Sequence, residues 1–537
     1  MTRTTTLQWM WTGAVSAACC LLGATAAAGA NGVATSDARH DVSAPFSLMA
    51  AQAATNAGSS AMQALMAQPT GASFSTAQAD PVAQPLATAL TGVTTGLNFE
   101  GQNDNDTLAL LGTKFVPPDT NGAVGATQFV QMVNVTIAVY SKRTGARVLG
   151  PALIHTLWTG FGGPCEFGGD GGDPVVLYDQ LAGRWFVSQL QFNRSFSSNQ
   201  ECIAVSTTSD ATGTYNRYQF DFGNQLPDYP KFGVWPDAYY SSQNMFQVAG
   251  GTFNFLGARA CALDRAAMLA GAAAKQICFQ TSAASLLPSD LDGSTLPAAG
   301  SPNYFVNLAS SSSLNLFQLH TDFANPANAT LTGPTAIPVA PFSQVCRFAV
   351  NRACIQEPPP GERLDSLDDR LMFRLAYRNF GDHESLVANH TIRNSGAIAG
   401  ARWYEIRSPR TSPVVFQQGT VVDPNTNFWM GSIAMDHTGN IALGFSAASL
   451  TLDPSVFVAG RAATDAPGTM SGPLAIVNGT GVQEHSFNRW GDYSAMSVDP
   501  ADDCTFWYTQ EYYETSGSFN WTTRIASFKF DSCGTRR

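Results

Sequence analysis

Residues 174–190 read PVVLYDQLAGRWFVSQL, two apolar stretches joined by a short turn around Asp179 and Gly183. β-Branched and aromatic residues dominate both stretches, a pattern typical of a β-hairpin. The same order of apolar strand, aspartate turn and aromatic strand recurs in residues 232–244, 431–446 and 493–513. The turn aspartates there are Asp237, Asp436 and Asp499. This recurrence predicts an all-β protein built from one repeated unit.

The spacing of these aspartates predicts how many units the chain holds. Asp179 and Asp237 are 58 residues apart, and Asp436 and Asp499 are 63 apart. The gap of 199 residues between Asp237 and Asp436 corresponds to three steps of about 66 residues, which leaves room for two more units. Suitable stretches occur at 303–322 and 370–392, and a further one lies upstream at 119–142.

Seven units predict a seven-bladed β-propeller, with a pair of β-sandwich domains as the alternative. The last unit has only three strands before the chain ends. Its outer strand is therefore expected from the N-terminal part, near 97–101 or 107–111, so that an N-terminal strand closes the ring and removes an exposed edge.

The chain before the repeats divides into two segments. Arg3, an apolar stretch from Trp9 to Leu22 and a small-residue run at 24–30 predict a secretory signal peptide over residues 1–30. A transmembrane anchor is the alternative, but it needs about 20 apolar residues. Residues 31–96 have few aromatics and predict a low-complexity linker or pro-segment with a short helix near Ala61–Ala67. The propeller domain is expected over 97–537, in a secreted or periplasmic protein.

Cysteine number and charge agree with this compartment. Eight cysteines follow the signal segment, and none shows the C-x-x-C spacing of a zinc or redox site. Neighbours in sequence give the simplest pairing for an oxidising compartment: Cys165–Cys202, Cys261–Cys278, Cys346–Cys354 and Cys504–Cys533. The net charge of −11 argues against a nucleic-acid partner. No later segment is apolar enough to predict a membrane span, and we expect a monomer.

Acidic residues gather just before the inner strand of the predicted blades, on the face where propellers bind ligands. They occur at six of seven equivalent positions, in a chain with only 13% charged residues. Asp492 and Asp173 are the leading catalytic candidates because each follows a glycine that lets a ligand approach the backbone. Asp119 and Asp369 are the second-rank catalytic candidates.

Three interpretations of these aspartates remain open. A carboxyl pair with one protonated member suits general acid–base chemistry and glycoside hydrolysis. Hard oxygen ligands also suit a structural calcium ion, although Asp290-Leu-Asp292-Gly293 is only a fragment of a calcium loop. Finally, aspartates commonly cap turns, which is the favoured interpretation for the four hairpin aspartates.

Other residues of the same face are candidates for contacting substrate. We expect stacking surfaces for sugar rings from two tryptophans, and polar or basic contacts from the other members of the set. The set is Arg489, Trp490, Tyr493, Trp429, Arg370, Tyr229, Lys231 and His383. No phosphate-binding loop and no G-x-S-x-G motif occurs, which argues against a nucleotide site and an α/β-hydrolase.

The segments VPPDTNGAVG (116–125), DYPKFGVWPDAYY (228–240) and RWGDYSAMSVDPADD (489–503) resemble secreted bacterial propellers that are loosely sialidase-like or BNR-type. The resemblance covers most of residues 116–533 and implies the propeller fold. Sialidase Asp boxes are present only in a degenerate form at 289–296.

The entrance acids favour a secreted carbohydrate-active enzyme, a glycoside hydrolase acting on an extracellular polysaccharide. A polysaccharide lyase and a non-catalytic sugar-binding or adhesion propeller are the alternatives. No cofactor is expected to be required.

Overall fold

The computed structural model describes residues 32–53, 74–75, 79–85, 89–347, 349, 352–394 and 396–534. Strands dominate these residues, so the predicted all-β class is confirmed. The helices are short: α1 (Phe46–Ala53), α2 (Asp104–Leu111), α3 (Pro164–Phe167), α4 (Arg265–Ala270) and the 3₁₀ turns η1 (Ile154–Trp158) and η2 (Pro326–Asn328). The predicted signal peptide and the helix expected near Ala61–Ala67 lie outside the described residues.

The strands form consecutive antiparallel units of four in chain order. The first three units are β5 (Asn121–Val124), β6 (Gln128–Val133), β7 (Thr136–Ser141) and β8 (Arg147–Leu153); β9 (Val175–Asp179), β10 (Arg184–Phe192), β11 (Asn199–Ser206) and β12 (Tyr215–Gly223); and β13 (Gln225–Val234), β14 (Tyr239–Ala249), β15 (Thr252–Leu263) and β16 (Lys275–Gln280).

The next two units share one sheet because β17 and β23 pair in parallel. Their strands are β17 (Leu287–Leu291), β18 (Asn303–Ser310), β19 (Ser313–His320) and β20 (Thr330–Pro338), then β23 (Met372–Asn379), β24 (Glu384–Arg393), β25 (Ala399–Arg407) and β26 (Val414–Val422).

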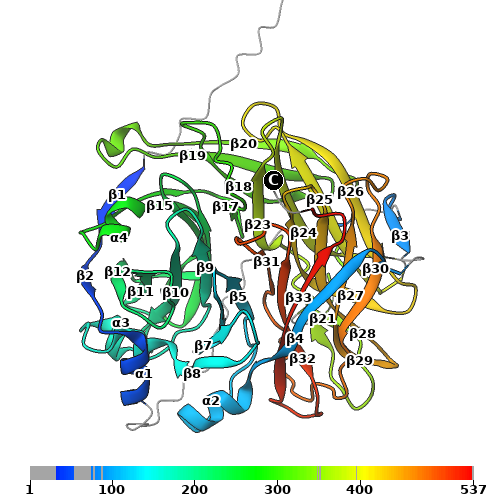
Figure 1. Cartoon of the computed structure of the whole chain (residues 1–537), viewed down its shortest axis with the longest axis horizontal. Helices are drawn as coiled ribbons and strands as arrows, with labels where there is room; N and C mark the ends of the chain where they lie inside the picture. Colours follow the sequence, from blue (N-terminus) through cyan, green and yellow to red (C-terminus); the bar gives the residue numbers. More distant parts are fainter. Residues whose placement is uncertain are drawn as a thin grey trace, which may run out of the picture.

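The last two units follow the same pattern. They are β27 (Asn427–Met435), β28 (Ile441–Ser449), β29 (Leu452–Arg461) and β30 (Ser471–Val477), then β31 (Ala495–Val498), β32 (Phe506–Tyr513) and β33 (Trp521–Phe530) with β4 (Val93–Asn103) as the outer strand. β4 pairs antiparallel with β33, so a strand from the start of the chain lies beside one from its end, blue against red in Figure 1.

The first strand of each unit contacts the first strand of the next unit. Along the chain β5 contacts β9, β9 contacts β13, and the series continues through β17, β23 and β27 to β31; β31 in turn contacts β5. Aromatic side chains fill the spaces between units. Phe186 packs on Phe232 at a centroid distance of 5.0 Å, and Phe129 of the first unit stacks on Trp507 of the last at 5.4 Å. The core is therefore divided among the interfaces between neighbouring units.

Part of the segment expected to be a linker is folded onto these sheets. β1 (Val33–Ser36) adds to the edge of β16, β2 (Arg39–Val42) to β12, and β3 (Ala83–Pro85) to β26. Phe46 and Met49 of α1 are buried against the first two units. The edge strand of a sheet has unpaired backbone N–H and C=O groups. β1, β2 and β3 pair with such edges, so this polar segment is held in place although it has no hydrophobic core of its own.

Residues 339–347, 349 and 352–371, between β20 and β23, form an insertion that we call the cap. It carries β21 (Ala353–Ile355), β22 (Leu364–Asp365) and the Cys346–Cys354 disulfide. Leu364 and Leu367 of the cap pack in one cluster with Trp429, Trp490 and side chains of the first unit. The backbone N–H of Asp365 donates to the carbonyl oxygen of Asn488 (2.7 Å). The cap therefore covers the ends of the inner strands where the candidate residues lie.

The cysteine pairing and the role of the turn aspartates were predicted correctly. All four expected disulfides are present. Asp179 Oδ1 accepts from the N–H of Ala182 (3.1 Å), and Asp499 Oδ1 accepts from that of Ala501 (2.8 Å). These hairpin aspartates therefore cap turns, as we expected. No helix in the described ranges is long and apolar enough to cross a membrane.

Candidate functional site

The residues at the start of the inner strands share an unusual backbone conformation. φ is positive at Asp119 (49°), Asp173 (51°), Tyr229 (56°), Met430 (53°) and Asp492 (60°). These residues belong to five different units. Positive φ is uncommon for residues other than glycine and persists only where the surrounding structure enforces it. Asp119, Asp173 and Asp492 precede their inner strands, whereas Tyr229 and Met430 lie at irregularities of the ladder inside β13 and β27.

Four aspartates meet there in a buried cluster. Asp119, Asp228 and Asp492 are each 1% exposed, and Asp173 is 6% exposed. Burial raises the pKa of Asp119 well above its usual range, and the nearby charges of Asp492 and Asp173 add to the shift. The Asp173 side chain also acts to raise the pKa of Asp119. Both effects favour the protonated form of the Asp119 carboxyl.

A lysine lies within the same cluster. Lys231 is fully buried, with Nζ 3.6 Å from the ring centroid of Tyr229 and 3.9 Å from that of Tyr493. Its Nζ donates to the carbonyl oxygen of Pro230 (2.9 Å). Burial lowers the pKa of Lys231 to about 8, although Asp173 and other carboxyls of the cluster oppose the shift. The ammonium group and the two aromatic faces form a cation–π arrangement.

Two arginines complete the cluster and set the charge of their partners. Arg489 pairs with Asp492 through Nη2. Burial raises the pKa of Asp492 while Arg489 opposes that shift, so Asp492 ionises more readily than the unpaired Asp119. Arg370 pairs with Asp369 (Nε–Oδ1 2.9 Å). Burial would raise the pKa of Asp369, but the charges of Arg370 and Arg352 outweigh it and lower the pKa below its usual value.

The cluster thus contains carboxyls in contrasting surroundings. The pKa of Asp119 is raised well above its usual range, whereas Asp492 and Asp369 each have a guanidinium partner. Titratable groups whose surroundings drive their pKa values apart are the usual components of a general acid–base pair. Carboxyls of this kind, together with buried cations, can protonate a leaving oxygen and activate a nucleophile.

Solvent does not reach these groups freely in the structure. The four cluster aspartates are at most 6% exposed. On the entrance side, Leu364 and Leu367 of the cap pack with Trp429 and Trp490. The sequence predicted residues at an open channel mouth, and the structure corrects this: the cluster is buried.

The two tryptophans expected to stack on sugar rings are buried instead. Trp429 and Trp490 are both 0% exposed and pack on each other at a centroid distance of 5.6 Å. Trp490 also stacks on Tyr513 at 5.7 Å, and its Nε1 donates to Ser446 Oγ (3.1 Å). The prediction of exposed stacking faces was wrong because the cap packs against these rings.

His383 is also remote from the cluster. It lies in the turn after β23, whereas Arg370 precedes that strand. Its Nδ1 contacts Asp382 Oδ1 (2.7 Å) and its ring stacks on Phe380. The other predicted substrate contacts, Arg489, Tyr493, Arg370, Tyr229 and Lys231, are brought together with Asp119, Asp173 and Asp492.

Two further acids belong to this region and were missed as site residues. Asp228 has both carboxylate oxygens buried without a hydrogen-bond partner, and burial together with the charge of Asp173 raises its pKa well above the usual range. Glu201 of β11 is buried nearby, and burial raises its pKa likewise. Asp228 stands in the PDYPK entrance loop and could have been found there, but nothing in the sequence distinguishes Glu201 from an outward-facing strand residue.

The calcium-loop fragment has a different role. Arg374 Nε pairs with Asp290 Oδ2 (2.7 Å), and its Nη1 donates to Asp292 Oδ2 (3.0 Å). These two acids therefore share one buried guanidinium.

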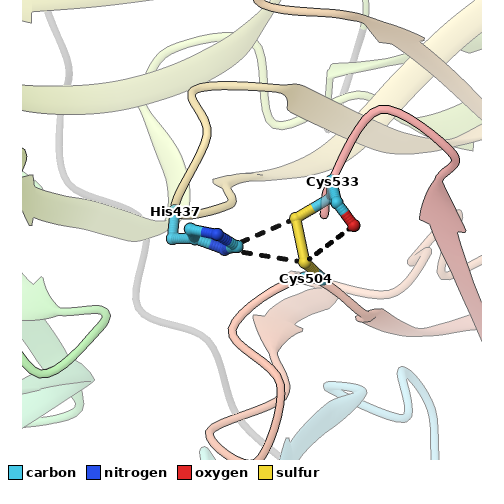
Figure 2. Close-up of side chains that lie close together, drawn as sticks. All are labelled: His437, Cys504 and Cys533. Carbon is cyan, nitrogen blue, oxygen red and sulfur yellow. Dashed lines mark hydrogen bonds between the residues drawn. A yellow bond between two sulfur atoms is a disulfide. The ribbon is translucent and has the colours of Figure 1, made fainter. Parts of the chain in front are cut away.

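One cluster of three potential metal ligands occurs within the described ranges, formed by His437, Cys504 and Cys533. Figure 2 shows the imidazole facing the sulfurs, with Nδ1 3.5 Å and 3.4 Å from the two Sγ atoms. The sulfurs are joined as a disulfide, so they offer no thiolate to a metal.

Comparisons with known proteins found no matching family model and no matching curated protein. Among solved structures, the chain is similar to a GH43 endo-arabinanase from Bacillus licheniformis (9% identity, 70% of this chain and 100% of that chain, TM-score 0.29). It is also similar to a xylan β-1,4-xylosidase from Bacillus halodurans C-125 (6%, 78% and 96%, TM-score 0.30) and to a Trypanosoma rangeli sialidase (8%, 67% and 54%, TM-score 0.27). TM-scores this low assign neither fold nor activity to the chain.

Proposed function

We propose that the chain is a seven-bladed β-propeller closed by an N-terminal strand. The supporting observations are the seven consecutive four-stranded units and the contacts that run from β5 through successive first strands to β31 and back to β5. β4 supplies the fourth strand of the last unit, as an open ring would require for closure. This arrangement brings the entrance loops of all units to one face.

The proposed activity is hydrolysis of a glycosidic bond in an extracellular polysaccharide. The observation that carries it is one buried cluster in which Asp492 has a guanidinium partner, whereas burial raises the pKa of Asp119 well above its usual range. In this proposal Asp119 protonates the glycosidic oxygen as the C–O bond breaks. Asp492 takes a proton from the water whose oxygen bonds to the anomeric carbon, and the charge of Asp173 favours the protonated form of Asp119. The cap must move for a polymer to reach these groups.

The test is a screen of purified polysaccharides for new reducing ends. Asp119→Asn and Asp492→Asn should each lower turnover by roughly 10²-fold or more, the scale of general acid–base groups. Asp382→Asn is the matched control, because the Asp382 side chain is 82% exposed and far from the cluster. Full activity in both cluster variants would remove these residues from the mechanism.

A polysaccharide lyase is the second candidate, and a specific observation supports it. Lys231, with a pKa near 8, lies against Tyr493 in a cluster that also holds Arg370 and Arg489. A lyase needs a base of this kind and cations that neutralise a uronate. The same screen separates the two reactions, because a lyase leaves an unsaturated uronate and a hydrolase does not. Binding of a polymer without either product would favour the non-catalytic adhesion alternative.

A further inference from the structure

A second cavity lies on the entrance side of the first unit, away from the central cluster. Its volume is about 430 Å³, within the range of roughly 300–1,000 Å³ of small-molecule sites. α1, α2, η1 and the loop around α3 surround it, and in Figure 1 these elements gather beside β8. One wall is apolar, with Met49, Leu111 and Phe115 among its residues. The polar part of the lining consists of His155, Thr159, Glu166 and Asp170.

The polar wall is fixed by internal hydrogen bonds. Asp170 accepts from the backbone N–H of His155 at Oδ1 (2.6 Å), and its Oδ2 lies 2.5 Å from the ring Nδ1. Both Asp170 oxygens are therefore engaged, and the imidazole is held with Nε2 at its opposite edge. The side chain of His155 is 31% exposed. Glu166 similarly uses both oxygens to accept from the backbone N–H groups of Gly160 and Gly162 (2.7 and 2.6 Å). The wall thus offers a preorganised imidazole and few uncommitted charges.

An exposed aromatic ring borders the same cavity. Phe167 is 76% exposed although it is a phenylalanine. It lies between Glu166, which is tied to the loop backbone, and Gly168, whose N–H bonds to Pro164, so the backbone that carries it is ordered. Phe167 also lines the cavity, so its ring lies beside the apolar residues Met49, Leu111 and Phe115 that line the same space.

We propose that this cavity is a saccharide-binding subsite for a neutral glycan chain. The choice of a glycan rests on the proposed function, and the site itself rests on the geometry. A sugar ring presents C–H groups that can stack on Phe167 and hydroxyl groups that can bond to His155 Nε2 and Thr159. The carboxylates of the wall are committed, and the His155–Asp170 pair has no excess positive charge to attract a uronate. A neutral chain is therefore the better match.

The position of the cavity links it to the central cluster. Asp170 is three residues before Asp173, and Phe115 is four residues before Asp119. The Asn134 side chain accepts from the N–H of Asp173 (3.0 Å), and its neighbour Val135 lines the cavity. The loops that shape the cavity thus continue directly into the cluster.

The test measures binding by titration calorimetry with arabinohexaose, xylohexaose, cellohexaose and polygalacturonate fragments as probes. Asp119→Asn protein is used so that no probe is consumed. At least one neutral hexaose should bind, and Phe167→Ala should weaken it roughly tenfold or more, as removal of an aromatic anchor does. Phe416→Ala is the matched control, an exposed phenylalanine (48%) on β26 of another unit. Asp170→Asn should also weaken binding, because it releases His155.

The outcomes separate this inference from the proposed activity. Failure of every neutral hexaose to bind, or equal binding by wild type and Phe167→Ala, overturns the subsite. Phe167-dependent binding with no new reducing ends in the wild-type screen leaves the subsite standing and removes the hydrolase. Cleavage of a polysaccharide with the same kcat/KM in the wild type and in Phe167→Ala supports the hydrolase and removes the subsite.

Discussion

Replacing Asp119 by asparagine should have opposite effects on activity and stability. Asp119 is buried, and burial together with the charges of Asp492 and Asp173 raises its pKa well above the usual range. In the unfolded chain an aspartate has a pKa near 3.9. Between the unfolded and folded pKa values the folded state therefore binds more protons than the unfolded state. This group's contribution to the free energy of unfolding is fully present below about pH 4 and is lost as the pH rises toward the folded pKa.

The size of this effect follows from linkage. Each pH unit between the unfolded and folded pKa values costs the wild type about 1.4 kcal/mol, whereas asparagine does not titrate. Unfolding a domain of roughly 440 residues carries an entropy of about 0.9 kcal/mol/K, so each pH unit corresponds to about 1.5 °C in Tm. Asp119→Asn should therefore match the wild type near pH 4 and gain about 1.5 °C in Tm per pH unit above that, while losing turnover roughly 10²-fold or more.

Calorimetric unfolding of both proteins between pH 4 and 7 measures the difference. Asp382→Asn serves as the exposed control and should show no comparable gain as the pH rises. A destabilised Asp119→Asn protein whose deficit does not change with pH would mean that Asp119 is needed as an anion, for example as a calcium ligand. That result would refute the assignment of Asp119 as the acid.

Features set by local sequence were predictable. The hairpin aspartates lie within a few residues of the N–H groups that they cap, so the pattern around Asp179 and Asp499 predicted both turn and role. The disulfides joined neighbours because each cysteine pair lies within one unit, within the cap or at the end of the last unit. The incomplete last unit also pointed to an N-terminal partner strand near 97–101. The structure has β4 there, while the alternative stretch 107–111 belongs to α2.

Features that depend on distant segments were not predictable. The sequence placed Trp429 and Trp490 at strand entrances, but whether such a position faces solvent depends on what lies above it. The cap that buries both rings comes from a connection some 60 residues before Trp429. The cavity near His155 was not predictable for the same reason. Its lining is complete only when α1 and α2, which precede the first unit in the sequence, pack against that unit. Strand periodicity identifies the ends of a strand and gives no information on an insertion that covers them.

The remaining predictions concern the ion pairs, the cap and calcium. Arg374→Met should destabilise the protein by about 3–5 kcal/mol in denaturant unfolding, because Asp290 and Asp292 would lose their buried guanidinium partner; a loss under 1 kcal/mol would contradict this role. Opening the eight-residue Cys346–Cys354 loop by a double serine variant should cost about 2–3 kcal/mol and speed proteolysis within the cap; unchanged cleavage would mean that the disulfide does not hold the cap. Chelator should lower Tm if a calcium ion is bound, and a Tm equal with and without EDTA would rule out a structural calcium ion. Finally, the cap should loosen at high pH. Burial raises the pKa of Glu357 to about 9, with smaller contributions from Asp453, Glu362 and Glu484, and its Oε2 accepts from the N–H of Gln483 (3.1 Å). The stability that protonated Glu357 gives the closed cap is complete below its unfolded pKa of about 4.3 and is lost as the pH rises through 9. Hydrogen exchange at residues 352–371 should therefore accelerate between pH 8 and 10, beyond the intrinsic rise, in the wild type but not in Glu357→Gln. Equal acceleration in both proteins would show that another group controls the cap.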